Sequence, residues 1–116
     1  MAIHLENVTV KNTYYRRVLM TTDNIQLVVM NIITDIPLEI HRKSDQFFRV
    51  EKGSMVVWMA DHKKGPYRRI RAKEGDSVTV PKNTYHRIIR TSEEPLKLYT
   101  IYSPPHHPKN RKQRKQ

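Results

Sequence analysis

Cysteine is absent from this sequence of 116 residues. Its absence excludes disulfide bonds, thiolate metal sites and cysteine nucleophiles together. Histidine, aspartate, glutamate and glutamine remain as the side chains that can bind a metal. A chain without thiols is also compatible with a reducing compartment. Any site chemistry is therefore expected to depend on imidazole, carboxylate and amide groups.

Long hydrophobic runs are also missing. No segment approaches the roughly 20 consecutive apolar residues that cross a bilayer as a helix. The first ten residues, Met1–Val10, have the pattern of neither a signal peptide nor a transit sequence. The sequence predicts a soluble protein without membrane contact, in the cytoplasm or another reducing intracellular compartment.

Acidic residues are few, since 11 Asp and Glu stand against 22 Lys and Arg, for a formal charge of +11. Such an excess makes nucleic acid or another polyanion a candidate partner, bound with strong salt dependence and little sequence preference. A run of charge is equally compatible with a solubilising face. The basic residues concentrate in a predicted hairpin and in the C-terminal segment: Lys63, Lys64, Arg68, Arg69 and Arg71, then Lys109, Arg111, Lys112, Arg114 and Lys115.

What is present is a series of short apolar segments separated by turn residues. The length and the 37% hydrophobic content suit one domain with a single core. Lys52-Gly53, Glu74-Gly75-Asp76 and Lys82-Asn83 favour sharp reversals, and no segment shows a sustained helical period. We predict an all-β sandwich or barrel with nine strands: Arg17–Met20, Ile25–Ile33, Leu38–His41, Gln46–Glu51, Ser54–Asp61, Tyr67–Ala72, Ser77–Val80, Thr84–Arg90 and Leu96–Tyr102.

The C-terminal segment differs from the rest, because it contains prolines and histidines and then a basic run. We predict a barrel domain over residues 1–103 and a basic arm over residues 104–116, extended or disordered. The adjacent His106 and His107 follow two prolines and are predicted to lie in a solvated loop.

Four polar residues on predicted strands form a candidate metal site. Glu39 and His41 point to one face because side chains alternate along a strand, and Gln46 faces inward on the next strand. His86 follows a turn about forty residues later. Imidazole, carboxylate and amide oxygen suit a divalent ion. The alternative is that Glu39 and His41 lie on an exposed rim while His86 is a hydrogen-bonded core histidine.

The order of these residues resembles the two motifs of the cupin superfamily. Glu39-Ile40-His41, Gln46 and Gly53 fit the first motif, and Gly75, Pro81, Asn83 and His86 fit the second. Two further segments are similar to small single-domain cupins labelled isomerase-like: Asp45–Glu51 and Leu96–Pro105. The resemblance implies a double-stranded β-helix, a small jelly-roll barrel with one metal inside near one mouth.

Departures from the motifs affect the expected metal site more than the fold. Asn83 stands where the motif has glycine, and asparagine is the next residue most tolerant of a left-handed turn. The implied ligands are Glu39, His41, Gln46 and His86, where three histidines and a glutamate are more frequent. Gln46 is the weakest member, because its amide can instead orient a water molecule. Mn, Fe, Ni and Zn all suit this set.

The resemblance leaves the activity open between two classes. In the first, the metal acts on a small ligand, anionic or sugar-like, by isomerase or oxygenase chemistry. Arg90 would clamp its carboxylate or phosphate, unless Arg90 has already reached the strand end and faces water. Phe48 is expected to fill the barrel and line an apolar pocket near the metal. In the second class, a non-catalytic barrel binds polyanions through its basic surface and arm. A homodimer is expected because cupins often pair through sheet edges.

Overall fold

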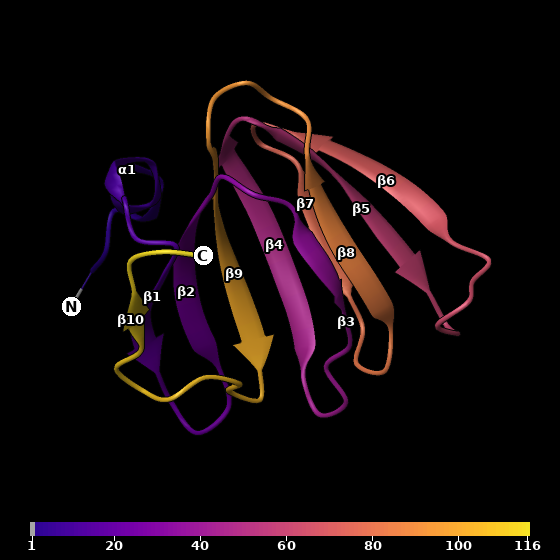
Figure 1. The fold of residues 1–116 in the computed structure, drawn as a ribbon. Helices are drawn as coiled ribbons and strands as arrows, with labels where there is room; N and C mark the ends of the chain where they lie inside the picture. The colour runs from indigo at the N-terminus through magenta and orange to yellow at the C-terminus, as the bar shows by residue number, and fades with distance from the viewer. Residues whose placement is uncertain (1) are drawn as a thin grey trace.

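Strands dominate the computed structural model, which describes residues 2–116 (Figure 1). The all-β class and the nine predicted strands are confirmed, with one short helix and a tenth strand added. The elements are α1 (Leu5–Lys11), β1 (Arg16–Thr21), β2 (Gln26–Ile32), β3 (Ile36–Glu39), β4 (Asp45–Lys52), β5 (Ser54–Ala60), β6 (Arg68–Lys73), β7 (Ser77–Val80), β8 (Tyr85–Arg90), β9 (Leu96–Ser103) and β10 (Lys112–Gln113).

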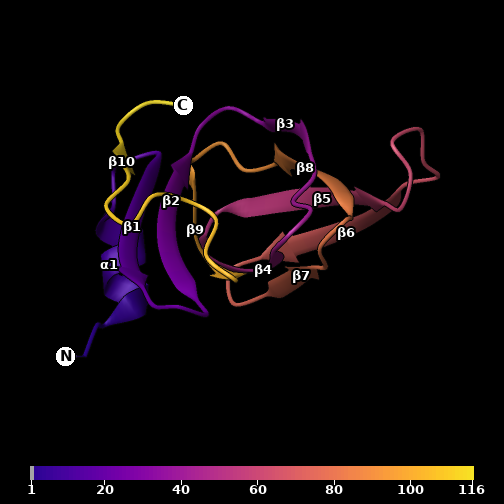
Figure 2. The ribbon, with the colours of Figure 1, turned by 90° about the horizontal axis from the view of Figure 1, so that it is seen from below.

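Two antiparallel sheets form the barrel. The six-stranded sheet has the order β10-β1-β2-β9-β4-β7, and the four-stranded sheet has the order β3-β8-β5-β6. The two sheets enclose a common interior in Figure 2, and one core cluster contains residues of both. β1–β2 and β5–β6 are hairpins, but other neighbouring strands are distant in sequence, as β2 and β4 both pair with β9. This is the jelly-roll arrangement that the cupin motifs predict.

Alternation along the strands decides which side chains fill the interior. Phe48 and Val50 of β4 and Leu96 and Leu98 of β9 are buried, while the residues between them are partly exposed. Burying these apolar side chains supplies most of the free energy that favours folding. One row of the six-stranded sheet breaks the apolar pattern near the barrel mouth, because polar residues lie there on the interior face: Gln26, Tyr102 and Gln46.

The short helix α1 packs against β2, β4 and β9. Its presence explains why β2 is buried on both faces, Leu27 and Val29 included. The sequence did not predict α1, because Val8, Thr9 and Val10 are β-branched residues with weak helix preference and the cap residue makes no side-chain bond. Within residues 2–116, no helix is both long and apolar enough to cross a membrane.

The C-terminal arm, residues 104–116, runs from the end of β9 back to β1 along one end of the barrel (Figure 1). β10 pairs with Arg16 and Arg17 of β1. Tyr15 and Val18 also donate backbone hydrogen bonds to carbonyls of the arm. The boundary between a domain over residues 1–103 and the arm stays a prediction, and Met1 lies outside the described residues.

Candidate metal centre

Glu39 and His86 form a directly opposed pair on β3 and β8. Side chains of such a pair project to the same face of the sheet, and His86 is fully buried inside the barrel. The predicted strand Leu38–His41 is shifted, because β3 ends at Glu39 and His41 lies two residues beyond it. The pairing of β3 with β8 and the segment that follows β3 together bring the three side chains into one place.

The three side chains converge on a small volume. The Oε1 atom of Glu39 lies 3.4 Å from Nε2 of His41 and 3.3 Å from Nε2 of His86. The ligand atoms of all three residues lie within 4.8 Å of one another. Of these side chains, only Glu39 is substantially exposed, at 38%. The carboxylate therefore forms the solvent side of the cluster.

The hydrogen bonds of the cluster fit a metal site better than a closed polar core. Nδ1 of His86 lies 3.0 Å from the carbonyl of Thr84, and as the donor in this bond it leaves Nε2 with a free lone pair. The Nε2 atoms of His86 and His41 are buried and make no hydrogen bond of good geometry among the described residues. Lone pairs that face one another in a buried site repel unless a cation or a proton lies between them. The donor set therefore fits a divalent ion.

Electrostatics keep the carboxylate of Glu39 ionised. Burial alone raises the pKa of Glu39, but the contacts with His41 and His86, and the positive charge of these imidazoles in their protonated form, together outweigh burial. The net pKa lies well below its ordinary value of 4.5. Metals bind carboxylates in the deprotonated form, so Glu39 is ready to bind a cation at neutral pH.

Gln46 on β4 is buried and is linked to the cluster through Tyr102. Its amide nitrogen donates to Oγ1 of Thr100 at 3.1 Å, while its Oε1 atom is buried without a partner. Tyr102, directly opposite Gln46 on β9, packs against the ring of His41. An unpaired amide oxygen in this place suits a fourth ligand or a bound water, so its role as a ligand stays a prediction.

The turn before β8 carries the asparagine that departs from the family motif. Asn83 has φ of 62°, the left-handed conformation that asparagine was predicted to adopt. Its backbone N–H donates to the carbonyl of His41 at 2.8 Å. The turn thus links the segment that carries His41 to the strand that carries His86.

Two residues of the arm border this centre. His106 and His107 lie in a loop, as predicted, and His106 is exposed while His107 is half-buried. The prediction did not include the ring contacts that both make. The ring of His106 lies 4.3 Å from that of His41 and stacks on Tyr102. The ring of His107 meets Tyr102 edge-on at 5.2 Å and lies 4.6 Å from the ring of His106. A pair of histidines between prolines is a weak signal for this placement, and no spacing relates them to the motifs.

The structure does not bring Arg90 to the centre. Its Nη1 atom donates to the carbonyls of Ser92, Glu93 and Glu94, so the guanidinium closes the loop between β8 and β9. Arg90 does end its strand, as one sequence alternative held, but its charge serves this loop. Phe48 is 1% exposed and belongs to the core, one row below Gln46.

The two basic groups lie at opposite ends of the molecule. The predicted hairpin is formed by β5 and β6, whereas β10 and the arm lie beyond β1 in both views (Figures 1 and 2). They do not form one continuous surface. On the hairpin side, Trp58 lies under the guanidinium of Arg69 at 4.4 Å and near that of Arg87 at 5.7 Å.

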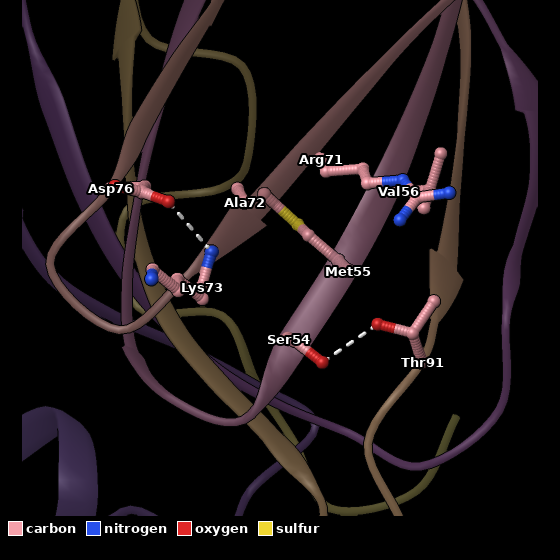
Figure 3. Close-up of a pocket in the computed structure, with 8 residues that line it drawn as sticks. All are labelled: Ser54, Met55, Val56, Arg71, Ala72, Lys73, Asp76 and Thr91. Carbon is pink, nitrogen blue, oxygen red and sulfur yellow. Dashed lines mark hydrogen bonds between the residues drawn. The ribbon is translucent and has the colours of Figure 1, made fainter.

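A cavity of about 490 Å³ lies at the other end of the four-stranded sheet from the candidate centre. Figure 3 shows its walls, where Ser54 bonds to Thr91 and the backbone of Lys73 bonds to Asp76. It lies at the start of β5, whereas His86 pairs with Met59 near the end of β5. The remaining lining residues are Met55, Val56, Arg71 and Ala72.

A jelly-roll barrel with two imidazoles and a carboxylate gathered at one mouth defines a cupin-type protein. The family model described as a cupin domain matches residues 26–102. The chain therefore belongs to the cupin family, as the motifs predicted.

Two curated relatives are uncharacterized proteins. One from Acanthamoeba polyphaga mimivirus is 40% identical over 109 residues, and YrkC from Bacillus subtilis is 37% identical over 108 residues. Each alignment covers 91% of this chain, but only 66% and 58% of the relatives. This chain therefore spans about three-fifths of the length of the relatives it matches.

Solved structures give the same fold. The crystal structure of BH2720 from Bacillus halodurans has a TM-score of 0.96 and 35% identity, over 99% of this chain and 89% of that one. A Bacillus subtilis oxalate decarboxylase studied for its Mn(II) centres has a TM-score of 0.65 and 20% identity, over 79% of this chain and 24% of that one. The second likeness is one of fold alone.

Proposed function

We propose that this protein is a metal-binding cupin that acts on a small molecule. Glu39, His41 and His86 would hold one divalent ion, with Gln46 as a fourth ligand or the holder of a bound water. The observation that carries the proposal is the pair of buried Nε2 atoms that face Glu39 without hydrogen-bond partners. A core histidine pair without a metal would be expected to have those atoms satisfied.

Bound metal would supply Lewis-acid polarisation of a carbonyl, or oxygen activation if the ion is iron. The donor set suits Mn, Fe, Ni or Zn, and availability can decide among them. Isomerase and oxygenase chemistry both remain proposals.

An anionic small molecule fits the polar interior better than a neutral one. Arg16 pairs with Met30, whose side chain is in the core, so Arg16 also projects inward. Its Nε atom is buried and unpartnered. Burial, followed by the charge of Arg16, lowers the pKa of His107 to about 3. The positive charge of Arg16 is therefore felt by a histidine of the arm near the barrel mouth. Arg16 therefore replaces Arg90 as the proposed anion-binding residue.

The metal proposal is tested by elemental analysis of protein loaded with Mn²⁺, Fe²⁺, Ni²⁺ or Zn²⁺ and then dialysed. We expect one ion per chain in the wild type and loss of that ion in His86→Ala. His62→Ala is the matched control, because His62 lies exposed in the β5–β6 hairpin. Equal metal content in wild type and His86→Ala would contradict the proposal.

Polyanion binding is a second candidate function. We also propose that the protein is a homodimer and that it works in a reducing intracellular compartment. One observation favours the polyanion candidate: Trp58 and Tyr67, 6.0 Å apart, lie among arginines on the β5–β6 hairpin. Aromatic and basic side chains together suit single-stranded nucleic acid. This surface lies outside the barrel, so the two functions do not compete for the same residues.

A further inference from the structure

The backbone of the strap, defined here as residues 104–108, is held by two buried side chains. Ser44 donates to the carbonyl of Pro104 at 2.7 Å, and Gln26 makes the larger set of contacts. Gln26 on β2 is fully buried. Its Oε1 atom accepts hydrogen bonds from the backbone N–H groups of His106 at 3.1 Å and His107 at 2.8 Å. Its Nε2 atom donates to the carbonyl of His107 at 2.7 Å and to Oγ1 of Thr21 at 3.1 Å. All four hydrogen-bonding positions of the amide are used.

His41 needs an orienting contact that its own segment does not provide. It lies just beyond the end of β3, and its backbone carbonyl is fixed by Asn83. His86, in contrast, has a partner for its Nδ1 atom in the carbonyl of Thr84. Among the described residues, no comparable hydrogen bond holds the ring of His41. Histidines that bind metals usually depend on such a partner for ring orientation.

Two aromatic rings contact the imidazole of His41 in place of a hydrogen-bond partner. Tyr102 meets the ring of His41 edge-on, at 5.5 Å and 87°. His106 meets it at 4.3 Å and 70°. The rings of His106 and Tyr102 stack on each other at 5.1 Å and 29°. The imidazole of His41 is therefore packed between the core and the strap, which leaves it 8% exposed.

We propose that the strap orients the metal ligand His41, with Gln26 positioning the strap backbone and the ring of His106 positioning the imidazole. The proposal rests on the metal function proposed above. It gives the role of orienting His41 to a segment that lies outside both family motifs. His106 is a positioning residue and not a ligand, because among residues 2–116 the group of converging ligand atoms consists of Glu39, His41 and His86.

A pair of substitutions separates ring packing from other roles of His106. His106→Ala removes the ring contact, whereas His106→Phe keeps an aromatic ring of similar width without nitrogen atoms. In chelator competition with Mn²⁺ or Zn²⁺, we expect His106→Ala to bind about tenfold or more weakly and His106→Phe to stay within about twofold of the wild type. His62→Ala controls for loss of a histidine. Wild-type affinity in His106→Ala would overturn the proposal, and weak binding in His106→Phe would overturn positioning by packing.

Gln26→Leu tests the backbone clasp. Trypsin cleavage at the basic residues that follow the strap reports its release, and we expect faster cleavage in Gln26→Leu than in wild type or His106→Ala, together with weaker metal binding. Thermal melting confirms that each variant is folded. Unchanged cleavage, or faster cleavage with unchanged metal affinity, would overturn the role of Gln26.

A measurement without metal separates failure of this proposal from failure of the metal function. Nuclear magnetic resonance of the His41 side chain in the metal-free protein reports ring order directly. We expect one ordered ring in wild type and in His106→Phe, and averaging over orientations in His106→Ala. Equal ring order in all three would overturn the orienting role even if the wild type binds metal. Ordered rings with no metal binding in the wild type would instead refute the proposed metal function.

Discussion

His107 makes the docking of the strap sensitive to acid. Burial first, and then the positive charge of Arg16, lowers the pKa of His107 from 6.5 to about 3. The folded protein therefore keeps His107 neutral over a range in which the unfolded chain takes up a proton. By linkage, the contribution of neutral His107 to the free energy of unfolding is complete above pH 6.5 and decreases as the pH falls toward 3.

His107→Phe should reduce this acid sensitivity, because phenylalanine retains an aromatic ring beside Tyr102 and cannot be protonated. We expect the urea midpoint of wild type to fall more between pH 7.5 and pH 4.5 than that of His107→Phe. His62→Phe, which changes an exposed histidine, should behave like wild type. A pH dependence common to all three proteins would show that His107 does not contribute.

At the scale of elements, the loop between β8 and β9 depends on Arg90. One guanidinium nitrogen satisfies three carbonyls there. Hydrogen bonds to a charged donor each contribute about 1.5–3 kcal/mol at most, and partial exposure reduces that value. Arg90→Met should therefore lower the free energy of unfolding by about 1–3 kcal/mol in urea titration. Metal affinity should be unchanged, whereas a loss of affinity in the folded variant would restore Arg90 to the site.

The distance of Arg90 from the candidate metal centre has a simple geometric origin. It lies four residues after His86 on the same strand, and a strand rises about 3.3 Å per residue. The four residues cover about 13 Å, which carries Arg90 from the mouth with the metal centre to the other end of the barrel. Alternation predicted the correct face, and of the two alternatives for Arg90 the one that put it at the strand end agrees with its position along the strand.

The elements that the sequence predicted are those with local signals. Turn residues separate β1 to β9, and the paired motifs predicted that Glu39, His41 and His86 would meet. α1 and β10 lack such signals, since one contains β-branched residues and the other only two residues, Lys112 and Gln113, that pair across the sheet. The place of His106 depends on Gln26, a partner eighty residues away, and no local pattern indicates that bond.

At the scale of the whole molecule, metal binding should stabilise the fold. An ion that binds only the folded state adds about 2.7 kcal/mol at one hundred times its dissociation constant. For a domain of this size that corresponds to a rise of roughly 10 °C in melting temperature. We expect this rise in wild type and His62→Ala and its loss in His86→Ala, measured by calorimetry with and without Mn²⁺ or Zn²⁺. Equal rises in all three would place the ion elsewhere.

The separation of the basic groups makes the polyanion proposal testable in two halves. Three charges can be neutralised in the hairpin, by Lys63→Gln, Lys64→Gln and Arg71→Gln, or three in the arm, by Lys109→Gln, Lys112→Gln and Lys115→Gln. If single-stranded nucleic acid binds beside Trp58, only the hairpin variant should show a flatter dependence of affinity on salt. Equal slopes for both variants and wild type would leave the charges without this role.

The edge strand β6 has a consequence for how copies of this protein meet. Four of its six residues are basic, Arg68, Arg69, Arg71 and Lys73, and it ends the four-stranded sheet. An unpaired edge invites strand addition by a neighbouring copy, and positive charge along it opposes that approach. The basic hairpin therefore protects the barrel from polymerising through its open backbone, a benefit that would persist even if no polyanion were ever bound.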